Sequence, residues 1–184
     1  LKEHISPAES RFITEETVRA GTMLAVAEMI LSGTTTYADG YFFPGAVARA
    51  AIEAGIRGIP ALGFIDFPTP DQPDPLRHEA VADRYLKTWQ GRSPLVTPAL
   101  FGHSPYTCSP GALRKIKDVA RRAGVRFFIH LAETREEVAL IRKRYGKRPV
   151  EYLHGLGLLD EDTVAVHGIW LEESDLDLLA ASGV

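Results

Sequence analysis

The feature that most constrains the fold of this chain is a regular alternation of short apolar segments with segments of helical periodicity. Parallel strands need a long connection, and a helix fits that connection best. The pattern therefore predicts parallel βαβ units with right-handed crossovers, either in a doubly wound sheet or in a piece of a (β/α)8 barrel. We expect strands at residues 34–38, 57–64, 95–101, 125–131 and 163–167, and helices at residues 15–32, 44–54, 76–89, 110–123, 135–145, 150–156 and 172–181.

Composition excludes several classes of protein. With 45% hydrophobic and 24% charged residues, the chain is neither a disordered tail nor a low-complexity sequence. A net charge of -3 gives no electrostatic footprint for nucleic acid or for an anionic membrane. The longest apolar run, near residues 23–31, contains Glu28 and is too short to span a bilayer. We therefore expect neither a nucleic-acid partner nor a membrane partner.

The single cysteine, Cys108, cannot form an internal disulfide, and no signal peptide opens the chain. We therefore expect a cytoplasmic protein. Cys108 precedes an expected helix with Ser109 as N-cap and Pro110 at the first helical position. A helix N-terminus can lower the pKa of a thiol, so Cys108 is either a nucleophile or, as we prefer, a small, semi-buried side chain.

Polar residues follow the expected strands at the end where (β/α)8 enzymes build their sites. Asp39, His103, His130 and His167 all lie at or just past the end of a strand. One histidine in such a place is usually a satisfied, half-buried side chain. Three from consecutive strands favour a site, because neutral imidazole is the commonest metal ligand. The turn after the first strand reads DGYFFP over residues 39–44 and lacks the glycine fingerprint of a dinucleotide-binding fold.

Two glutamates have a structural and a functional interpretation. Glu133 follows His130 by three residues and lies near a helix start, where Thr134 and Glu137 form a capping-box pattern. It is either a loop carboxylate or, as we prefer, the general acid/base beside a metal-bound water. Glu9 belongs to a second capping-box pattern in SPAE at residues 6–9, and spacing alone favours the structural interpretation there.

Cationic residues give weaker signals. Arg77 opens an expected helix, where a cation gains nothing from the helix dipole. It either binds an anionic group of a substrate or is solvated. The basic run at residues 142–148 is most simply a solvated helix end.

Four motifs occur in one order along nearly the whole chain: AEMILSGTTT at residues 27–36 with Asp39, HSPYTCS at 103–109, HLAET at 130–134 and VHG at 166–168. In these motifs the chain resembles the amidohydrolase superfamily. The resemblance is to the branch of 5'-methylthioadenosine/S-adenosylhomocysteine deaminases with their chlorohydrolase and guanine deaminase relatives.

The resemblance implies a (β/α)8 barrel that binds one divalent metal, usually zinc, with iron as an alternative. It also implies roles for individual residues. His130 matches a metal ligand, and Glu133 matches the general acid/base, which also contacts the substrate. His167 matches the histidine that orients the hydroxide and the substrate, and His103 matches a substrate-binding histidine. Glu9 matches the glutamate that contacts the ribose hydroxyls, and Arg77 matches one of two arginines near an amino-acid carboxylate.

The implied reaction is hydrolytic deamination of a purine nucleoside such as 5'-methylthioadenosine, adenosine or S-adenosylhomocysteine. The second arginine position falls near Ala61-Leu62, which favours 5'-methylthioadenosine or adenosine, with residues 64–70 as an apolar wall. The partner is then a small molecule, and dimers are common in the branch, which leaves a homodimer open. The alternatives are a chlorohydrolase or guanine-deaminase-type hydrolase, a non-catalytic remnant, and a thiol hydrolase built on Cys108.

Part of the implied metal site is absent from the sequence. The H-x-H pair and the aspartate ligand would lie before Leu1 and after Val184. A (β/α)8 barrel needs about 250 residues, so we expect residues 1–184 to be a fragment truncated at both ends, covering strands two to six of the barrel. Open edge strands and an unfinished metal site should make the isolated segment poorly stable and inactive.

Overall fold

The computed structural model describes residues 5–184, apart from the side chain of Ser6, and divides into two compact units. The N-terminal unit holds the chain up to Gly63 together with Phe67–Ala99. The C-terminal unit holds Phe64–Asp66 and Leu100–Val184. Each unit is described by itself.

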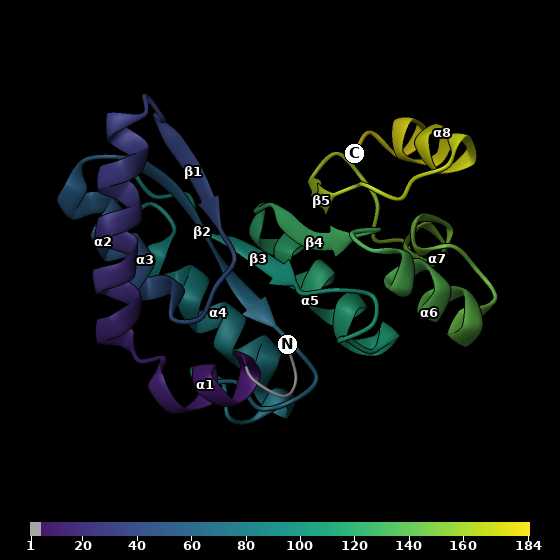
Figure 1. Cartoon of the computed structure of the whole chain (residues 1–184), viewed down its shortest axis with the longest axis horizontal. Coiled ribbons are helices and arrows are strands. Elements are labelled where there is room, and N and C mark those ends of the chain that lie inside the picture. The colour runs from purple at the N-terminus through teal and green to yellow at the C-terminus, as the bar shows by residue number, and fades with distance from the viewer. Residues whose placement is uncertain (1–4) are drawn as a thin grey trace. The chain divides into compact units, whose positions relative to one another are not determined.

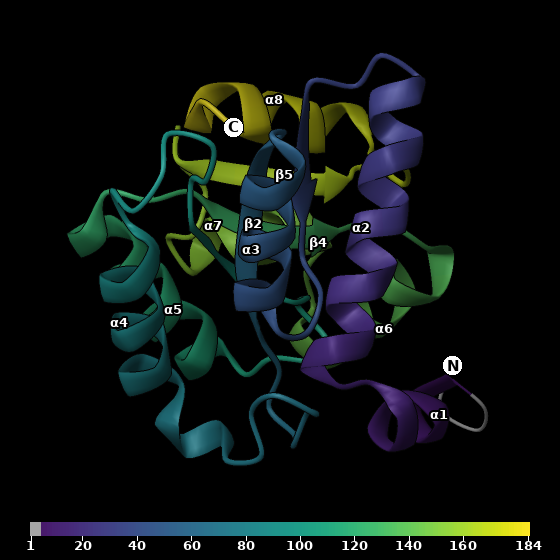
Figure 2. The ribbon, with the colours of Figure 1, turned by 90° about the vertical axis from the view of Figure 1, so that its left-hand side faces the viewer.

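The N-terminal unit consists of helices packed beside a pair of parallel strands. In β1 and β2, Thr36 lies opposite Arg57 and Asp39 opposite Pro60. Helices α2 and α3 lie side by side (Figure 2), and buried Val18, Ala46 and Val47 form a small apolar cluster. The elements are α1 (Ile5–Phe12), α2 (Glu15–Leu31), β1 (Thr36–Asp39), α3 (Pro44–Ala54), β2 (Arg57–Phe64), the 3-10 helix η1 (Pro75–Arg77) and α4 (His78–Trp89).

The C-terminal unit contains three parallel strands in chain order with helices between them (Figure 1). Leu100 lies opposite Phe127, and Leu131 lies opposite His167. The elements are β3 (Ala99–Gly102), α5 (Pro110–Ala123), β4 (Phe127–Leu131), α6 (Arg135–Tyr145), α7 (Pro149–Gly155), β5 (Thr163–His167) and α8 (Glu173–Ser182). Its largest fully buried apolar side chains are Phe64, Leu100, Leu113, Ile116, Phe127, Ile129, Leu131, Ile141, Leu153 and Leu158.

The predicted alternation is confirmed, since each of the five strands is followed by a helix. Five predicted elements have the observed bounds: α3, β2, α5, α6 and β5. Where a glycine in the left-handed region ends a helix, as Gly55 does at φ 75° and Gly124 at φ 63°, the boundary is sharp.

The strand predicted at residues 95–101 is shorter than expected. Val96 forms only an isolated bridge with Gly58, and β3 starts at Ala99. Pro98 explains the gap, because proline has no N–H to donate to a ladder.

Three smaller predictions also need correction. The short, β-branched segment at residues 34–38 predicts a buried strand, but the strand is observed at Thr36–Asp39 with exposed and half-buried residues alternating. It has a single strand neighbour, β2, among the described residues. The helix expected at residues 76–89 begins as the 3-10 turn η1, because the Asp74 side chain accepts a hydrogen bond from the Leu76 N–H.

Helix α1 was not among the predicted elements. It begins at Ile5, one residue before the SPAE capping-box pattern at residues 6–9, and the side chain of Ser6 lies outside the description.

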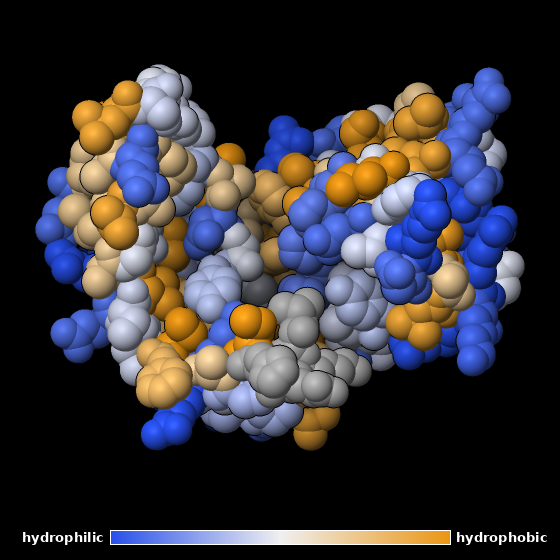
Figure 3. Space-filling view, in the orientation of Figure 1, coloured by the Kyte–Doolittle hydropathy of each residue, from blue (hydrophilic) through white to orange (hydrophobic). Residues whose placement is uncertain are grey.

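Helix α2 leaves much of its apolar surface exposed. Its buried residues are Val18 and Val26, whereas Leu24, Ile30 and Leu31 are 65%, 48% and 89% exposed. Apolar side chains are visible on the surface over α2 in Figure 3. None of the helices in residues 5–184 is both long and apolar enough to cross a membrane.

Candidate functional site

Within the C-terminal unit, the strand ends bring three histidines together. His103 follows β3, His130 is the fourth residue of β4 and His167 is the last residue of β5. The ring centre of His130 lies 5.0 Å from that of His103 and 4.8 Å from that of His167. The backbone reinforces this arrangement, because the His130 N–H donates a 3.0 Å hydrogen bond to the His103 carbonyl. Consecutive parallel strands thus place their terminal side chains in one cluster.

The His103 ring is held by hydroxyl groups of the turn that follows it. Its Nδ1 lies 2.8 Å from Thr107 Oγ1 and 3.3 Å from Ser104 Oγ. Burial, followed by the neighbouring His130, lowers the pKa of His103 to about 4. His103 is therefore a neutral, oriented hydrogen-bonding group at neutral pH.

His130 carries the clearest sign of a ligand that the protein itself does not supply. Its Nδ1 is buried and has no hydrogen-bond partner among the described residues, although buried nitrogens are normally satisfied. Burial, and then the adjacent His167, lower the pKa of His130, and the carboxylate of Glu133 opposes the shift. A neutral imidazole with an unsatisfied nitrogen fits a metal ion.

One histidine does not complete a metal site. In the part of the chain that the structure describes, no group of three or more His, Cys, Asp or Glu side chains is arranged to hold a metal ion. Among the described residues, His130 therefore has no second and third side chain arranged to share a metal ion with it.

Glu133 and His167 lie beside each other on neighbouring strand ends. His167 Nε2 is 3.6 Å from Glu133 Oε1, and the two side chains are 31% and 40% exposed. Both groups can therefore meet a ligand from solvent. His167 has a φ of 79°, and backbone of this kind in a non-glycine residue is enriched at functional sites.

The loop that presents Glu133 differs from the predicted capping box. Thr134 Oγ1 accepts a hydrogen bond from the Glu137 N–H, as that pattern requires. The Glu137 carboxylate does not return to the Thr134 N–H, however, but accepts from Ala132 and Glu133. The capping-box prediction is therefore right for Thr134 and wrong for Glu137.

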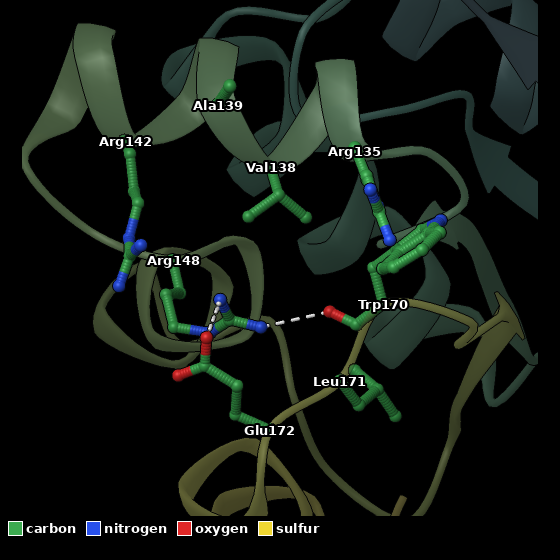
Figure 4. A pocket seen from close by; sticks show the side chains of 8 residues that line it. All are labelled: Arg135, Val138, Ala139, Arg142, Arg148, Trp170, Leu171 and Glu172. Atoms are coloured by element: carbon green, nitrogen blue, oxygen red, sulfur yellow. Dashed lines mark hydrogen bonds and ion pairs between the residues drawn. The ribbon is translucent and has the colours of Figure 1, made fainter.

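Arg148 anchors the loop that follows His167. Arg148 donates a 2.9 Å hydrogen bond to the Trp170 carbonyl and bonds the carboxylates of Asp175 and Glu172 at 2.8 and 2.6 Å. Figure 4 shows Arg148 beside Glu172 and the Trp170 carbonyl. The guanidinium of Arg135 lies 4.2 Å from the centre of the Trp170 ring. Arg135, Arg148, Trp170 and Glu172 are among the residues that line a cavity of about 370 Å³, and none of the predicted site residues lines it.

Two predicted site residues belong to the N-terminal unit. Glu9 accepts a 2.8 Å hydrogen bond from the Tyr41 hydroxyl, and burial followed by this bond raises the pKa of Tyr41 to about 12. Arg77 is exposed at the end of η1. Asp39 ends β1, and burial raises the pKa of its carboxyl against a backbone hydrogen bond from Tyr41. Substrate-binding roles for Glu9 and Arg77 stay predictions.

Cys108 does not have the properties of a nucleophile. It is 4% exposed, and its Sγ donates a 3.1 Å hydrogen bond to the Phe64 carbonyl. Burial raises the pKa of the thiol to about 11. The lowering of the pKa that a helix N-terminus can cause is therefore not observed for Cys108. Cys108 is therefore a packed side chain, as preferred from the sequence, and it is more deeply buried than the predicted semi-buried state.

Known proteins similar to this chain include purine deaminases. The 5-methylthioadenosine/S-adenosylhomocysteine deaminase of Aquifex aeolicus is 40% identical over 179 residues, which are 97% of this chain and 41% of the relative. The crystal structure of an adenosine deaminase from Xanthomonas campestris with bound zinc is 34% identical and superposes on 100% of this chain and 42% of its own, with a TM-score of 0.94. The zinc complex of atrazine chlorohydrolase from Arthrobacter aurescens TC1 is 21% identical over 94% of this chain and 42% of its own, with a TM-score of 0.84, and shares the fold.

These similarities confirm the fold class, an α/β protein of parallel strands consistent with a partial (β/α)8 barrel. The chain spans about two fifths of the length of the curated relatives it matches, 41% and 42% for the first two. The profile of the Amidohydrolase family matches residues 2–184. The chain therefore belongs to the amidohydrolase family, and it is related to the deaminases of 5-methylthioadenosine and S-adenosylhomocysteine.

Proposed function

We propose that the protein containing this chain is a metal-dependent deaminase that converts an adenosine-type nucleoside into its inosine analogue and ammonia. The observation that carries the proposal is the cluster of His103, His130, Glu133 and His167 at consecutive strand ends, with a buried, unsatisfied nitrogen on His130. The similarity to deaminases of adenosine-type nucleosides supports the substrate class.

We propose that His130 supplies one ligand to a zinc ion, with iron as the alternative metal. The remaining ligands would come from segments outside residues 1–184, which would then form strands two to six of a larger catalytic barrel. When bound, such a metal lowers the pKa of a coordinated water, so that hydroxide is available near neutral pH.

Glu133 carries the proton transfers in this proposal. Its half-exposed carboxylate takes a proton from the attacking water and delivers it to the purine ring nitrogen next to C6 as hydroxide adds to that carbon. Glu133 then moves the proton of the new C6 hydroxyl group to the amino group, so that the C6 carbonyl forms as the C–N bond breaks and ammonia leaves. His167, 3.6 Å away, orients the nucleophile and the substrate, and neutral His103 supplies a directed hydrogen bond to the purine.

Substrate contacts outside this cluster complete the proposal. Glu9 would bind the ribose hydroxyls, and Arg77 would face the tail of the nucleoside. The family resemblance puts the second arginine position near Ala61 and Leu62, neither of which is cationic, so 5'-methylthioadenosine or adenosine should be preferred over S-adenosylhomocysteine. A clearly higher kcat/KM for S-adenosylhomocysteine in the full-length protein would overturn this preference.

The main test measures ammonia release from 5'-methylthioadenosine and adenosine by the full-length protein. We expect Glu133→Gln to lower kcat by about 100-fold or more, because general acid/base catalysis contributes about 10²- to 10⁴-fold. Cys108→Ala is the control and should keep a near-normal rate. Loss of activity in the Cys108 variant would favour the thiol hydrolase. Chloride release from a chlorinated triazine without ammonia release from the nucleosides would favour the chlorohydrolase alternative.

A further inference from the structure

Glu137 has an unusual arrangement for a residue in the first turn of a helix. It is 4% exposed and lies in α6, where the Thr134 side chain caps its N–H at 3.1 Å. Its Oε1 accepts a 2.9 Å hydrogen bond from the Ala132 N–H, and its Oε2 accepts a 2.9 Å hydrogen bond from the Glu133 N–H. Both oxygens of one buried carboxylate therefore hold two successive peptide groups just beyond β4.

The backbone that Glu137 holds is in an unfavourable conformation. Ala132 has a φ of 52°, one of three positive values in non-glycine residues of the described chain, and such a value persists only when the surroundings impose it. The other side of Ala132 is also fixed, because its carbonyl accepts hydrogen bonds from Ile169 at 3.1 Å and Trp170 at 2.8 Å. Ala132 thus connects the loop that bears Glu133 to the loop that follows His167.

Helix capping alone does not explain this geometry. In a capping box the glutamate returns to the N–H of the N-cap residue, which here is Thr134. Glu137 instead reaches past Thr134 to the peptide N–H groups of the two residues before it, one of which is Glu133. The carboxylate therefore accepts hydrogen bonds from the loop after β4 and not from the N-cap residue of the helix.

We infer that Glu137 is a positioning residue. It sets the backbone of Ala132 and Glu133 so that the Glu133 carboxylate meets the substrate and stays beside His167. The inference rests on the proposed function of Glu133. Glu137 itself touches none of the reacting atoms in this account, and it acts through the two peptide N–H groups that it accepts.

The test uses Glu137→Gln in the full-length protein, because glutamine keeps the size of the side chain but offers only one acceptor oxygen for two N–H donors. We expect kcat to fall by about 10- to 100-fold, while KM stays within about threefold. Amide exchange at Ala132 and Glu133 should become faster, whereas the metal content should not change.

Two control variants separate positioning from stability. Glu136→Gln changes the neighbouring carboxylate, which is exposed in the same turn, and should leave kcat and amide exchange unchanged. Thr134→Ala removes the helix cap and should lower the thermal midpoint with a much smaller loss of kcat than Glu137→Gln. An equal loss of kcat in Thr134→Ala and Glu137→Gln would overturn the positioning role.

The remaining outcomes are also decisive. In an active enzyme, an unchanged kcat or an unchanged amide exchange in Glu137→Gln would overturn the inference. If the wild-type protein deaminates no nucleoside, the proposed function fails. Amide exchange in Glu137→Gln then tests the hydrogen bonds of Glu137 separately from activity. Faster exchange at Ala132 and Glu133 would show that Glu137 fixes the loop, and unchanged exchange would refute this.

Discussion

Gly102 ends β3 immediately before His103, and the space around its Cα is already filled. A Cβ atom at this position would lie 2.7 Å from Leu113 Cδ2 and 2.8 Å from the ring of Phe127. Both side chains are fully buried, so neither can move without disturbing the core. The residue before a candidate substrate-binding histidine is thus fixed by packing.

This packing predicts that Gly102→Ala destabilises the protein by about 1–3 kcal/mol, the usual cost of overpacking a core. The measurement is the free energy of unfolding of the full-length protein in urea. Gly111→Ala is a suitable control, because a Cβ atom there would meet nothing within 4 Å. Equal stabilities for the two variants would contradict the packing argument.

The residues of the cluster were predictable from sequence because of where they fall. His103, His130 and His167 each follow an apolar strand, and parallel strands end on one side of a sheet. The orientation of Glu137 was not predictable, because the capping-box pattern specifies residue types and not which N–H the carboxylate accepts. The sequence left two interpretations of Cys108 open because the helix start is a local feature, whereas the burial that raises the pKa of its thiol depends on tertiary packing.

At the scale of elements, a buried charge pair joins α5 to the start of β5. Lys117 has a fully buried side chain and donates hydrogen bonds to Asp160 at 2.5 Å and to Thr163 at 2.8 Å. Arg121 donates to the other oxygen of Asp160 at 2.8 Å. Burial alone would raise the pKa of Asp160, but the hydrogen bonds from Lys117 and Arg121 outweigh it and lower that pKa to about 2.

The lowered pKa gives a pH prediction for this pair. Asp160 binds a proton more readily in the unfolded chain than in the folded one, so its contribution of about 2 kcal/mol is present above pH ~4 and is lost as the pH falls towards 2. Asp160→Asn should remove this part of the pH dependence. It should also destabilise the protein by about 3 kcal/mol at neutral pH, because a buried ammonium group then lacks its counter-ion.

Urea denaturation of the full-length protein between pH 7 and pH 2.5 measures both effects. The control is Asp118→Asn, because Asp118 is 58% exposed and lies 3.7 Å from Arg121. Exposed pairs of this kind contribute about 0–1 kcal/mol, so this variant should behave like the wild type. A pH profile of Asp160→Asn that parallels the wild type would show that Asp160 is not the titrating group.

At the scale of the whole molecule, the fold class could be predicted because five strands are each followed by a helix of suitable length. The extent of the strands could not be predicted as well, since Pro98 interrupts the ladder between Val96 and Ala99. The completeness of the site is also a property of the whole molecule. His130 has a buried nitrogen without a hydrogen-bond partner, and the residues that the structure describes do not form a metal site around it.

Two features of the described residues support our proposal that residues 1–184 are part of a larger barrel. Among the described residues, β1 has β2 as its single strand neighbour, and β5 has β4. Both strands therefore present an edge that can pair with another chain. Leu24, Ile30 and Leu31 add exposed apolar surface on α2.

We therefore predict that residues 1–184 expressed alone will aggregate or unfold without a cooperative transition, and will copurify with little metal. The full-length protein should unfold cooperatively and bind the metal, because further strands would cover both edges and supply the missing ligands. Size-exclusion chromatography, urea denaturation and metal analysis of the two proteins, prepared side by side, measure the difference. A soluble monomer of residues 1–184 that unfolds cooperatively and carries one metal ion would show that the described residues suffice for both folding and metal binding, against the proposal of a truncated barrel.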